Sequence, residues 1–243
     1  MKNAVIITAK GGNTTVQNKN IIPICGTPIM LFPVRAARLA ALAEGVFVST
    51  EDPTIKSIAQ KEGVEIIDRP QFLSEPTSQH KDVIKHAVEV LREKHPELKN
   101  VVVLLGNTVM VTSGLIDRSF RMLEADDCDS VVSVWKAQDD HPYRALTQSE
   151  GGYLENFHNK EVSSNRQSYP DVYFYDQGVW AFEADCALKQ EGPSPWLWLG
   201  KQCRMIERPW VTGRDVHSWI DISASAWYLN SIQVHDYLDY QED

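Results

Sequence analysis

Two adjacent glycines, preceded by a lysine and followed by an asparagine, form the stretch of this sequence best suited to binding an anion. Lys10-Gly11-Gly12-Asn13 directly follows residues 4–9, a short apolar run rich in valine and isoleucine. Without Cβ atoms, the glycines let backbone N–H groups approach an anion closely, and Lys10 and Lys19 add positive charge. The residue types therefore predict an anion-binding loop at the end of a buried strand.

The spacing of this loop differs from that of two common nucleotide-binding motifs. It is neither G-x-G-x-x-G, which cradles a dinucleotide, nor G-x-x-x-x-G-K-[ST], the P-loop. NAD-dependent and P-loop functions are therefore disfavoured. By itself the pair of glycines indicates only an anion site, and a tight turn that binds nothing is the alternative interpretation.

Asp221 is the candidate metal ligand. It lies among Trp219, Ile220 and Ile222, where we expect the end of a strand. A carboxylate among apolar neighbours is costly unless it is paired or coordinated, and carboxylate oxygen is a ligand that Mg²⁺ accepts. The alternative is that Asp221 caps the terminal helix, although Ser223 is better placed for that role.

Strands and helices alternate through the first 135 residues and so could position these side chains. Buried strands are expected at residues 4–9, 46–50, 64–67, 101–105 and 130–135. Amphipathic helices are expected at residues 30–43, from 52–53 onward, at 81–94 and at 116–124. Strands at 171–182 and 203–207 and a helix at 223–240 complete the chain.

This alternation predicts an α/β fold with a doubly wound, mostly parallel sheet. Ligands bind such sheets at the carboxyl ends of the strands, so the loops after Ala9, Thr50, Ile67 and Leu105 should border the site. Residues 136–170 are polar and rich in turns, and we expect them to be an insertion outside the sheet. Residues 1–243 are then one domain with one insertion.

Composition excludes several classes of function. The chain has 24 basic and 33 acidic residues and a net charge of −9, so binding to DNA or RNA is not expected. No apolar run reaches the length of about 18 residues that spans a bilayer. Without a recognisable signal peptide, the expected location is the cytoplasm.

Beyond the loop, ordered motifs along nearly the whole chain resemble those of the acylneuraminate cytidylyltransferases, the CMP-sialic acid synthetases and their relatives. Residues 7–21, ITAKGGNTTVQNKNI, resemble the family signature I-P-A-R-G-G-S-K-G-I-P-x-K-N-I without gaps. Residues 49–52 (STED), 69–70 (RP) and 82–87 (DVIKHA) are similar to its S-T-D-D, R-P and D-V-I-x-H-A. Later matches are 129–134 (DSVVSV), 141–144 (HPYR), Arg166-Gln167 through Gln177-Gly178, and 220–223 (IDIS).

The resemblance implies a Rossmann-like nucleotidyltransferase fold and an Mg²⁺-dependent reaction. CTP and an acidic nonulosonic sugar, such as sialic acid, would give a CMP-sugar and pyrophosphate. The insertion resembles the family's dimerisation arm, which implies a homodimer. The residues implied in catalysis are Lys10, Lys19 and the metal ligand Asp221. Those implied in nucleotide binding are Gly11, Gly12, Asn13, Asn20, Arg69 and His80, and those implied in substrate binding are Gly106, Asn107, Arg144, Arg166, Gln167 and Gln177.

Several departures from the family pattern fall on these positions. Ser223 replaces the second aspartate of I-D-I-D, and Gly106-Asn107 stands where the family has Q-P. Asn13 and His80 replace serines, and Thr14-Thr15 replaces a K-G pair. These changes leave three alternatives open: another acidic sugar or nucleotide, a metal held mainly by the triphosphate and Asp221, or a homologue that binds its ligands without turnover.

Overall fold

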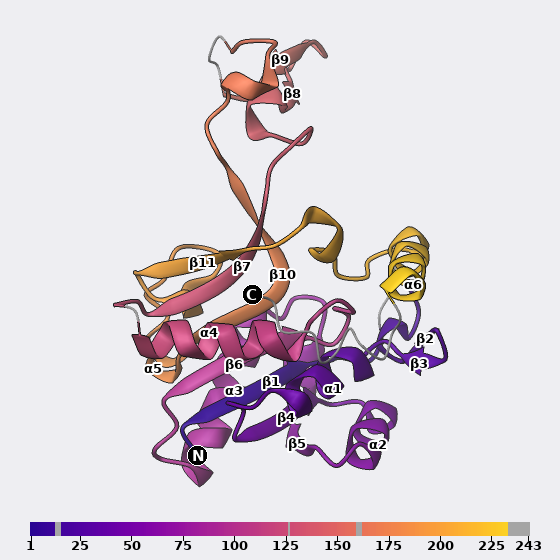
Figure 1. The fold of residues 1–243 in the computed structure, drawn as a ribbon, viewed down its shortest axis with the longest axis vertical. Coiled ribbons are helices and arrows are strands. Elements are labelled where there is room, and N and C mark those ends of the chain that lie inside the picture. Colours follow the sequence, from indigo (N-terminus) through magenta and orange to yellow (C-terminus); the bar gives the residue numbers. More distant parts are fainter. Residues whose placement is uncertain (13–15, 126, 159–161, 233–243) are drawn as a thin grey trace.

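A seven-stranded sheet forms the centre of the computed structural model, which describes residues 1–12, 16–125, 127–158 and 162–232 (Figure 1). The strand order is β11-β7-β10-β6-β1-β4-β5. Only β10 runs antiparallel to its neighbours β6 and β7, which confirms the mostly parallel sheet. The strands are β1 (Asn3–Thr8), β4 (Gly45–Thr50), β5 (Glu65–Asp68), β6 (Asn100–Leu105), β7 (Ser130–Lys136), β10 (Tyr173–Glu183) and β11 (Cys203–Glu207).

Helices cover both faces of the sheet because successive strand residues point to opposite sides. On β1, Val5 and Ile7 pack toward α1 (Leu31–Leu39), α2 (Pro53–Lys61) and α4 (Ser113–Ala125). Ala4 and Ile6 pack toward the helices of the other face, α3 (His80–Lys94) and α5 (Ala184–Lys189). The sheet is therefore doubly wound, as the sequence predicted.

The strand order reverses at β1, which pairs with β4 on one side and β6 on the other. The chain first moves outward from β1 to β4 and β5 and then returns to β6. Such a reversal leaves a crevice beyond the carboxyl ends of the strands. The glycine loop follows β1 and therefore lies at this crevice.

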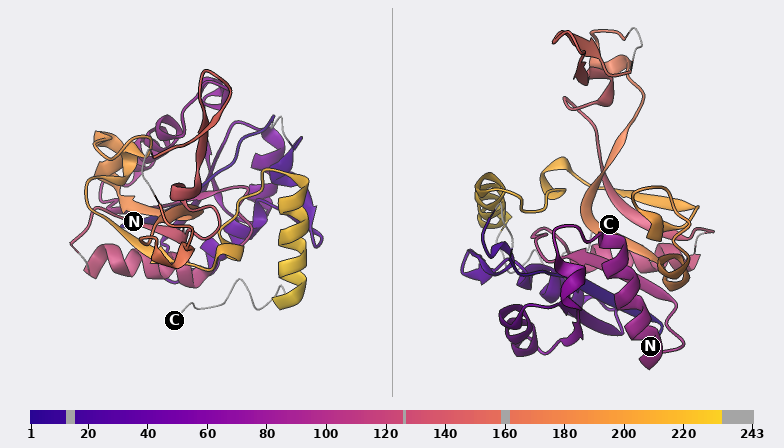
Figure 2. Two further views of the ribbon diagram at one scale, coloured as in Figure 1. Left: turned by 90° about the horizontal axis from the view of Figure 1, so that it is seen from above. Right: turned by 180° about the vertical axis from the view of Figure 1, so that it is seen from behind.

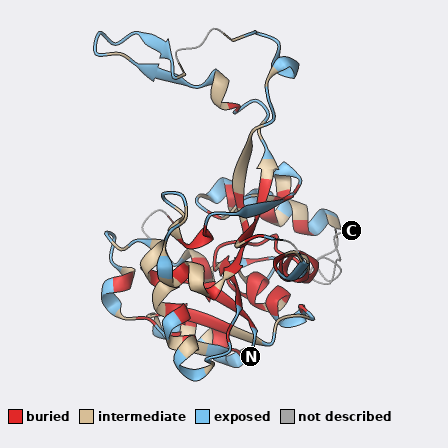
Figure 3. Ribbon diagram, turned by 90° about the vertical axis from the view of Figure 1, so that its left-hand side faces the viewer, coloured by how far each residue is buried: buried red, intermediate tan, exposed pale blue. Residues whose placement is uncertain are grey.

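Residues 137–172 form an arm between β7 and β10. The arm carries the hairpin β8 (Leu146–Gln148) and β9 (Leu154–Asn156), with the short helices η3 (Pro142–Arg144) and η4 (Arg166–Ser168). It stands away from the body, and most of its described residues are exposed (Figures 1 and 3). The hairpin belongs to a separate small sheet, so the insertion lies outside the central sheet.

Two helix boundaries lie four residues from their expected positions. Helix α1 ends at Leu39, short of the expected residue 43, because the carboxylate of Asp117 accepts the N–H groups of Ala41 and Leu42 at 3.0 and 2.8 Å. The described part of the terminal helix, α6 (Trp219–Ile232), begins four residues before the expected start. Residues 233–240 of that prediction lie outside the described residues.

Helix α6 lies beside the hairpin of β2 (Pro23–Ile24) and β3 (Thr27–Pro28) (Figures 1 and 2). Asp221 is in the first turn of α6, so the prediction that it ends a strand is wrong. Within the described residues, no helix is both long enough and apolar enough to cross a membrane.

Candidate active site

The glycine loop has the backbone geometry that its sequence predicted. Gly12 adopts a φ of 62°, which favours glycine. At Gly11 a Cβ atom would lie 2.4 Å from Oδ2 of Asp52, so a larger residue there would force the side chain of Asp52 to move. Asn20 is 4% exposed and its side-chain amide donates to the carbonyl of Lys10 at 2.9 Å. Asn20 therefore braces the loop from within, and Asn13 lies outside the described residues.

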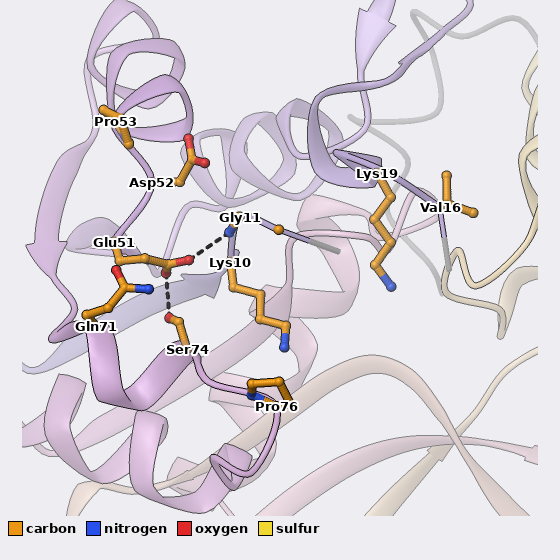
Figure 4. A pocket seen from close by; sticks show the side chains of 11 residues that line it. Lys10, Gly11, Val16, Lys19, Glu51, Asp52, Pro53, Gln71, Ser74 and Pro76 are labelled. Carbon is orange, nitrogen blue, oxygen red and sulfur yellow. Dashed lines mark hydrogen bonds between the residues drawn. The ribbon is translucent and has the colours of Figure 1, made fainter. Parts of the chain in front are cut away.

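A pocket of about 410 Å³ opens in front of this loop. Lys10 and Lys19 line the side of the pocket formed by the glycine loop, and Ser74 and Pro76 line another wall (Figure 4). The loops after β1, β4 and β5 all contribute to it, as the topology predicted, whereas the fourth loop of that prediction, after β6, does not line this pocket. Its lining residues are Lys10, Gly11, Gly12, Val16, Lys19, Glu51, Asp52, Pro53, Gln71, Ser74 and Pro76.

Lys19 begins the short helix η1 (Lys19–Ile21) and lies between the glycine loop and the segment before α6. Its Nζ donates to the carbonyl of Val216 at 3.0 Å. Burial lowers the pKa of Lys19, and Lys10 acts in the same direction, whereas Asp215 and Asp221 oppose the shift. The ammonium of Lys19 is thus close to a second set of charged groups as well as to the pocket.

Glu51 accepts a hydrogen bond from one of the backbone N–H groups of the glycine loop. Its Oε1 accepts the N–H of Gly11 at 2.8 Å, and its Oε2 accepts the hydroxyl of Ser74 at 2.6 Å (Figure 4). The carboxylate thus stands where an anionic ligand could use the same donor. The topology predicted that the loop after Thr50 borders the site, but no sequence pattern indicated this contact.

Arg69 and His80 lie inward of the pocket rather than on its lining. Arg69 is 7% exposed and donates to the carbonyl of Ser49 at 2.6 Å. Burial lowers its pKa to about 10, against the opposing charge of Glu51, so Arg69 is cationic at neutral pH. Burial and the charge of Arg69 lower the pKa of His80 to about 4, so its imidazole is neutral at pH 7.

The ring of His80 closes an aromatic cluster at the amino end of α3. Its Nε2 lies 3.1 Å from the hydroxyl of Thr8, at the end of β1. The ring centroids of Trp180 on β10 and Trp198 in η5 (Leu197–Leu199) are 5.3 and 5.6 Å away. Nucleotide contact by Arg69 and His80 stays a prediction, and the structure shows them fixed by protein groups.

Residues after β6 meet the segment before α6. At Gly106 a Cβ atom would lie 2.7 Å from the Cβ of Ala9, so glycine permits the close approach of the two loops. The side-chain amide of Asn107 donates to Oδ2 of Asp215 at 2.8 Å and to the carbonyl of Val216 at 2.9 Å. Asn107 therefore holds Asp215 at the crevice, beside Lys19.

Gln177 is brought to the same region by a kink in β10. Its φ is 61°, and its carbonyl accepts the hydroxyl of Thr108 at 3.1 Å. The pairing of β10 with β7 shifts register between Tyr175 and Trp180, around this residue. Asn107 and Gln177, both predicted substrate ligands, are therefore connected through Thr108.

Asp221 is held by the start of α6. Its Oδ2 accepts the backbone N–H groups of His217 and Ser218 at 3.0 and 2.8 Å, and its Oδ1 accepts Arg214 Nη2 at 3.0 Å. Burial raises the pKa of Asp221, but these hydrogen bonds and the hydroxyl of Ser218 together hold it below its ordinary value. Asp221 thus makes one of the two bonds of a capping box, to the N–H of Ser218, and both oxygens that a metal would use are engaged.

Asp215 is the carboxylate that sequence reasoning missed. Its Oδ2 accepts Asn107 and lies 2.9 Å from Nε2 of His217, and its side chain is 11% exposed. The D-x-H spacing of Asp215 and His217 was a weak signal. Among the residues that the structure describes, there is no group of three or more His, Cys, Asp or Glu side chains suited to a metal. A cation here would therefore need ligand phosphates to complete its coordination.

Arg144, Arg166 and Gln167 lie on the arm, which stands away from the body (Figure 1). The guanidinium groups of Arg144 and Arg166 pair with the same carboxylate, Asp139, at 3.3 and 2.7 Å. Both arginine side chains are half exposed. The structure does not bring them to the glycine loop.

Comparisons with known proteins bear on the family to which the chain belongs. Residues 4–161 match the family described as cytidylyltransferase. Pseudaminic acid cytidylyltransferase of Campylobacter jejuni serotype O:2 is 23% identical over 193 residues, which cover 79% of this chain and 82% of that protein. Post-translational flagellin modification protein B of Campylobacter coli is 24% identical over 238 residues, or 95% and 97% of the two chains.

A solved structure supports the same fold. CMP:2-keto-3-deoxy-manno-octonic acid synthetase, solved with CTP, has a TM-score of 0.71 to this chain at 17% identity. The match covers 95% of this chain and 99% of that one. Because the family match spans more than half of the sequence, this chain belongs to the cytidylyltransferase family as a divergent member and is a nucleotidyltransferase.

Proposed function

We propose that the protein activates an acidic sugar of the nonulosonic type, sialic acid or a relative, by transferring CMP to it from CTP. The observation that carries the proposal is the glycine loop at the end of β1, which opens on a pocket of about 410 Å³ flanked by Lys10 and Lys19. Relatives named for pseudaminic acid and N-acylneuraminate cytidylyltransferases support the class of sugar.

The proposed step is an in-line displacement at the α-phosphorus of CTP. The anomeric hydroxyl oxygen of the sugar forms the new P–O bond and loses its proton to water, and the bond to pyrophosphate breaks so that pyrophosphate leaves with its electron pair. The protein contributes position and positive charge. Lys10, Lys19 and the amides of the glycine loop would neutralise the triphosphate, because they border the same pocket.

We further propose that Mg²⁺ supports this reaction and that Asp215 holds it together with the triphosphate. Mg²⁺ binds through one or two carboxylates plus substrate phosphates, and it would neutralise charge on those phosphates. Asp215 lies beside Lys19, whereas Oδ2 of Asp221 accepts the backbone N–H groups at the start of α6 and its Oδ1 pairs with Arg214. The originally predicted metal ligand, Asp221, therefore fits the ion less well than Asp215.

The arm supports a proposed homodimer. Four large apolar or aromatic side chains on it are between 55% and 77% exposed: Leu146, Tyr153, Leu154 and Phe157. Exposed apolar clusters of this kind mark interaction surfaces. In a dimer, Arg144 and Arg166 would meet the carboxylate of the sugar in the partner's site. Sedimentation as a monomer at micromolar concentration would contradict the dimer.

The test of the function is pyrophosphate release with CTP, Mg²⁺ and a panel of nonulosonic acids. We expect release with at least one acid sugar, and a product whose mass equals that of the CMP-sugar. ATP, GTP and UTP serve as controls for the nucleotide. Binding of CTP without turnover of any sugar would contradict the proposal.

A further inference from the structure

Arg208 and Asp176 form an ion pair behind the site, and both side chains are completely buried. Arg208 Nη1 lies 2.9 Å from Asp176 Oδ2. Removing two charges from water is costly, and the cost is offset only when the remaining hydrogen-bonding groups are also satisfied. What the pair contributes to the structure therefore depends on the groups to which Asp176 and Arg208 are hydrogen-bonded.

Asp176 fixes the kink of β10. Its Oδ1 accepts the N–H of Gly178 at 2.8 Å and the hydroxyl of Ser133 on β7. The same hydroxyl oxygen accepts the N–H of Val179 at 2.8 Å. These bonds surround Gln177, whose left-handed φ of 61° is uncommon for a residue with a side chain. The carboxylate thus sets the direction in which Gln177 leaves the strand.

Arg208 connects this kink to two other segments. Its Nη2 donates to the carbonyl of Met110, after β6. Its Nη1 lies 3.5 Å from the carbonyl of Thr212 in η6 (Trp210–Thr212), the turn that precedes Asp215. One guanidinium therefore ties together β10, the segment after β6 and the segment before α6.

Two glycines make room for the pair. A Cβ atom at Gly178 would lie 2.5 Å from Arg208 Nη1, and one at Gly213 would lie 2.7 Å from the Cβ of Asp176. The three tied segments carry Gln177, Asn107 and Asp215, which also meet through the hydrogen bonds of Asn107 and Thr108. The buried charges thus lie behind the residues assigned to the sugar and metal side of the site.

We propose that Asp176 and Arg208 are positioning residues for the sugar half of the site. The inference rests on the proposed function and on the prediction from sequence that Gln177 and Asn107 contact the sugar. Neither charged group needs to touch a substrate. Its effect passes through the kink at Gln177 and the segments that hold Asn107 and Asp215, so the binding of the sugar depends on the pair more strongly than the binding of CTP.

The test compares D176N with the double variant D176N/R208Q. D176N leaves the arginine facing an amide donor, whereas the glutamine of R208Q can accept from that amide and still donate to a backbone carbonyl. We expect D176N to raise the KM for the sugar about tenfold or more, with the Kd for CTP, measured without Mg²⁺ so that Asp215 does not contribute, nearly unchanged, and the double variant to recover part of the loss. D185N is the control, because Asp185 pairs with Arg92 in a half-exposed ion pair.

Hydrogen exchange supplies a measurement that needs no turnover. Faster exchange in residues 106–110 and 209–216 of D176N, with residues 4–9 unchanged, is expected. Unchanged sugar KM and unchanged exchange would overturn the inference, and so would an equal loss of sugar and CTP binding. If the wild-type protein turns over no sugar, the proposed function fails, and the exchange result alone decides the positioning role. If D176N does not fold, D176N/R208Q carries the same comparison against wild type.

Discussion

Neutralising Asp215 and Asp221 one at a time separates a catalytic carboxylate from a structural one. Asp221 accepts two backbone N–H groups and the hydroxyl of Ser218 at 2.8 to 3.0 Å, and it pairs with Arg214. Loss of a cap costs about 0.5–2 kcal/mol, and the lost charge at the helix start adds a few tenths to 1 kcal/mol. We therefore expect Asp221→Asn to lower the free energy of unfolding by about 1–3 kcal/mol.

For Asp215→Asn we expect a small change in stability and a large loss of turnover. The new amide oxygen can still accept from Asn107, so the free energy of unfolding should change by less than about 1 kcal/mol. Loss of the negative charge beside Lys19 removes the proposed anchor for Mg²⁺. A loss of about 3 kcal/mol of transition-state stabilisation corresponds to a turnover about 100-fold lower.

The assay pairs denaturant unfolding with initial rates of pyrophosphate release at several Mg²⁺ concentrations. Asp215→Asn should need a higher Mg²⁺ concentration for half-maximal rate and should turn over slowly. Asp221→Asn should unfold at a lower denaturant concentration and keep most of its turnover under folding conditions. Abolished turnover in a stable Asp221→Asn protein, together with an active Asp215→Asn protein, would refute this assignment and restore Asp221 as the metal ligand.

Two further predictions concern the nucleotide side. Glu51→Gln keeps an acceptor for the N–H of Gly11 but removes a negative charge from the pocket, so CTP should bind about threefold to tenfold more tightly in calorimetry; weaker binding would show that the carboxylate helps the ligand. The pKa of His80 is about 4 in the folded protein and about 6.5 in the unfolded chain. Between these two pH values the unfolded state binds more protons than the folded state, so the free energy of unfolding falls as the pH falls from 6.5 to 4. Lowering the pH from 7 to 5 should cost up to about 2 kcal/mol through His80, and His80→Gln should remove that part of the loss in unfolding curves; an identical pH dependence in both proteins would contradict it.

The alternating strands and helices could be predicted from sequence because each strand is a short apolar run with its own pattern. The same patterns located the loops after β1, β4 and β5 at the site, since parallel strands end at one edge of the sheet. Asp221 was misplaced because α6 is apolar on nearly all sides, so Trp219, Ile220 and Ile222 carry no helical periodicity. The capping-box pattern from Ser218 to Asp221 was the signal that could have corrected it.

The remaining features depend on contacts between distant parts of the chain. Asp215 is held by a hydrogen bond from Asn107, 108 residues away, and Glu51 accepts the N–H of Gly11, 40 residues away. Asp176 and Arg208 are 32 residues apart and meet only when β10 and the end of β11 are assembled. Such pairings have no local pattern, so residue types alone could not predict them.

A crystal structure of the protein with CTP and Mg²⁺ tests the central assignment most directly. We expect the triphosphate in the pocket in front of the glycine loop, with its oxygens near the amides of Gly11 and Gly12 and within reach of Lys10 and Lys19. We also expect the N–H of Gly11 to donate to the ligand in place of Glu51. CTP bound elsewhere, or an unaltered contact between Glu51 and Gly11 with the pocket empty at saturating CTP, would contradict it.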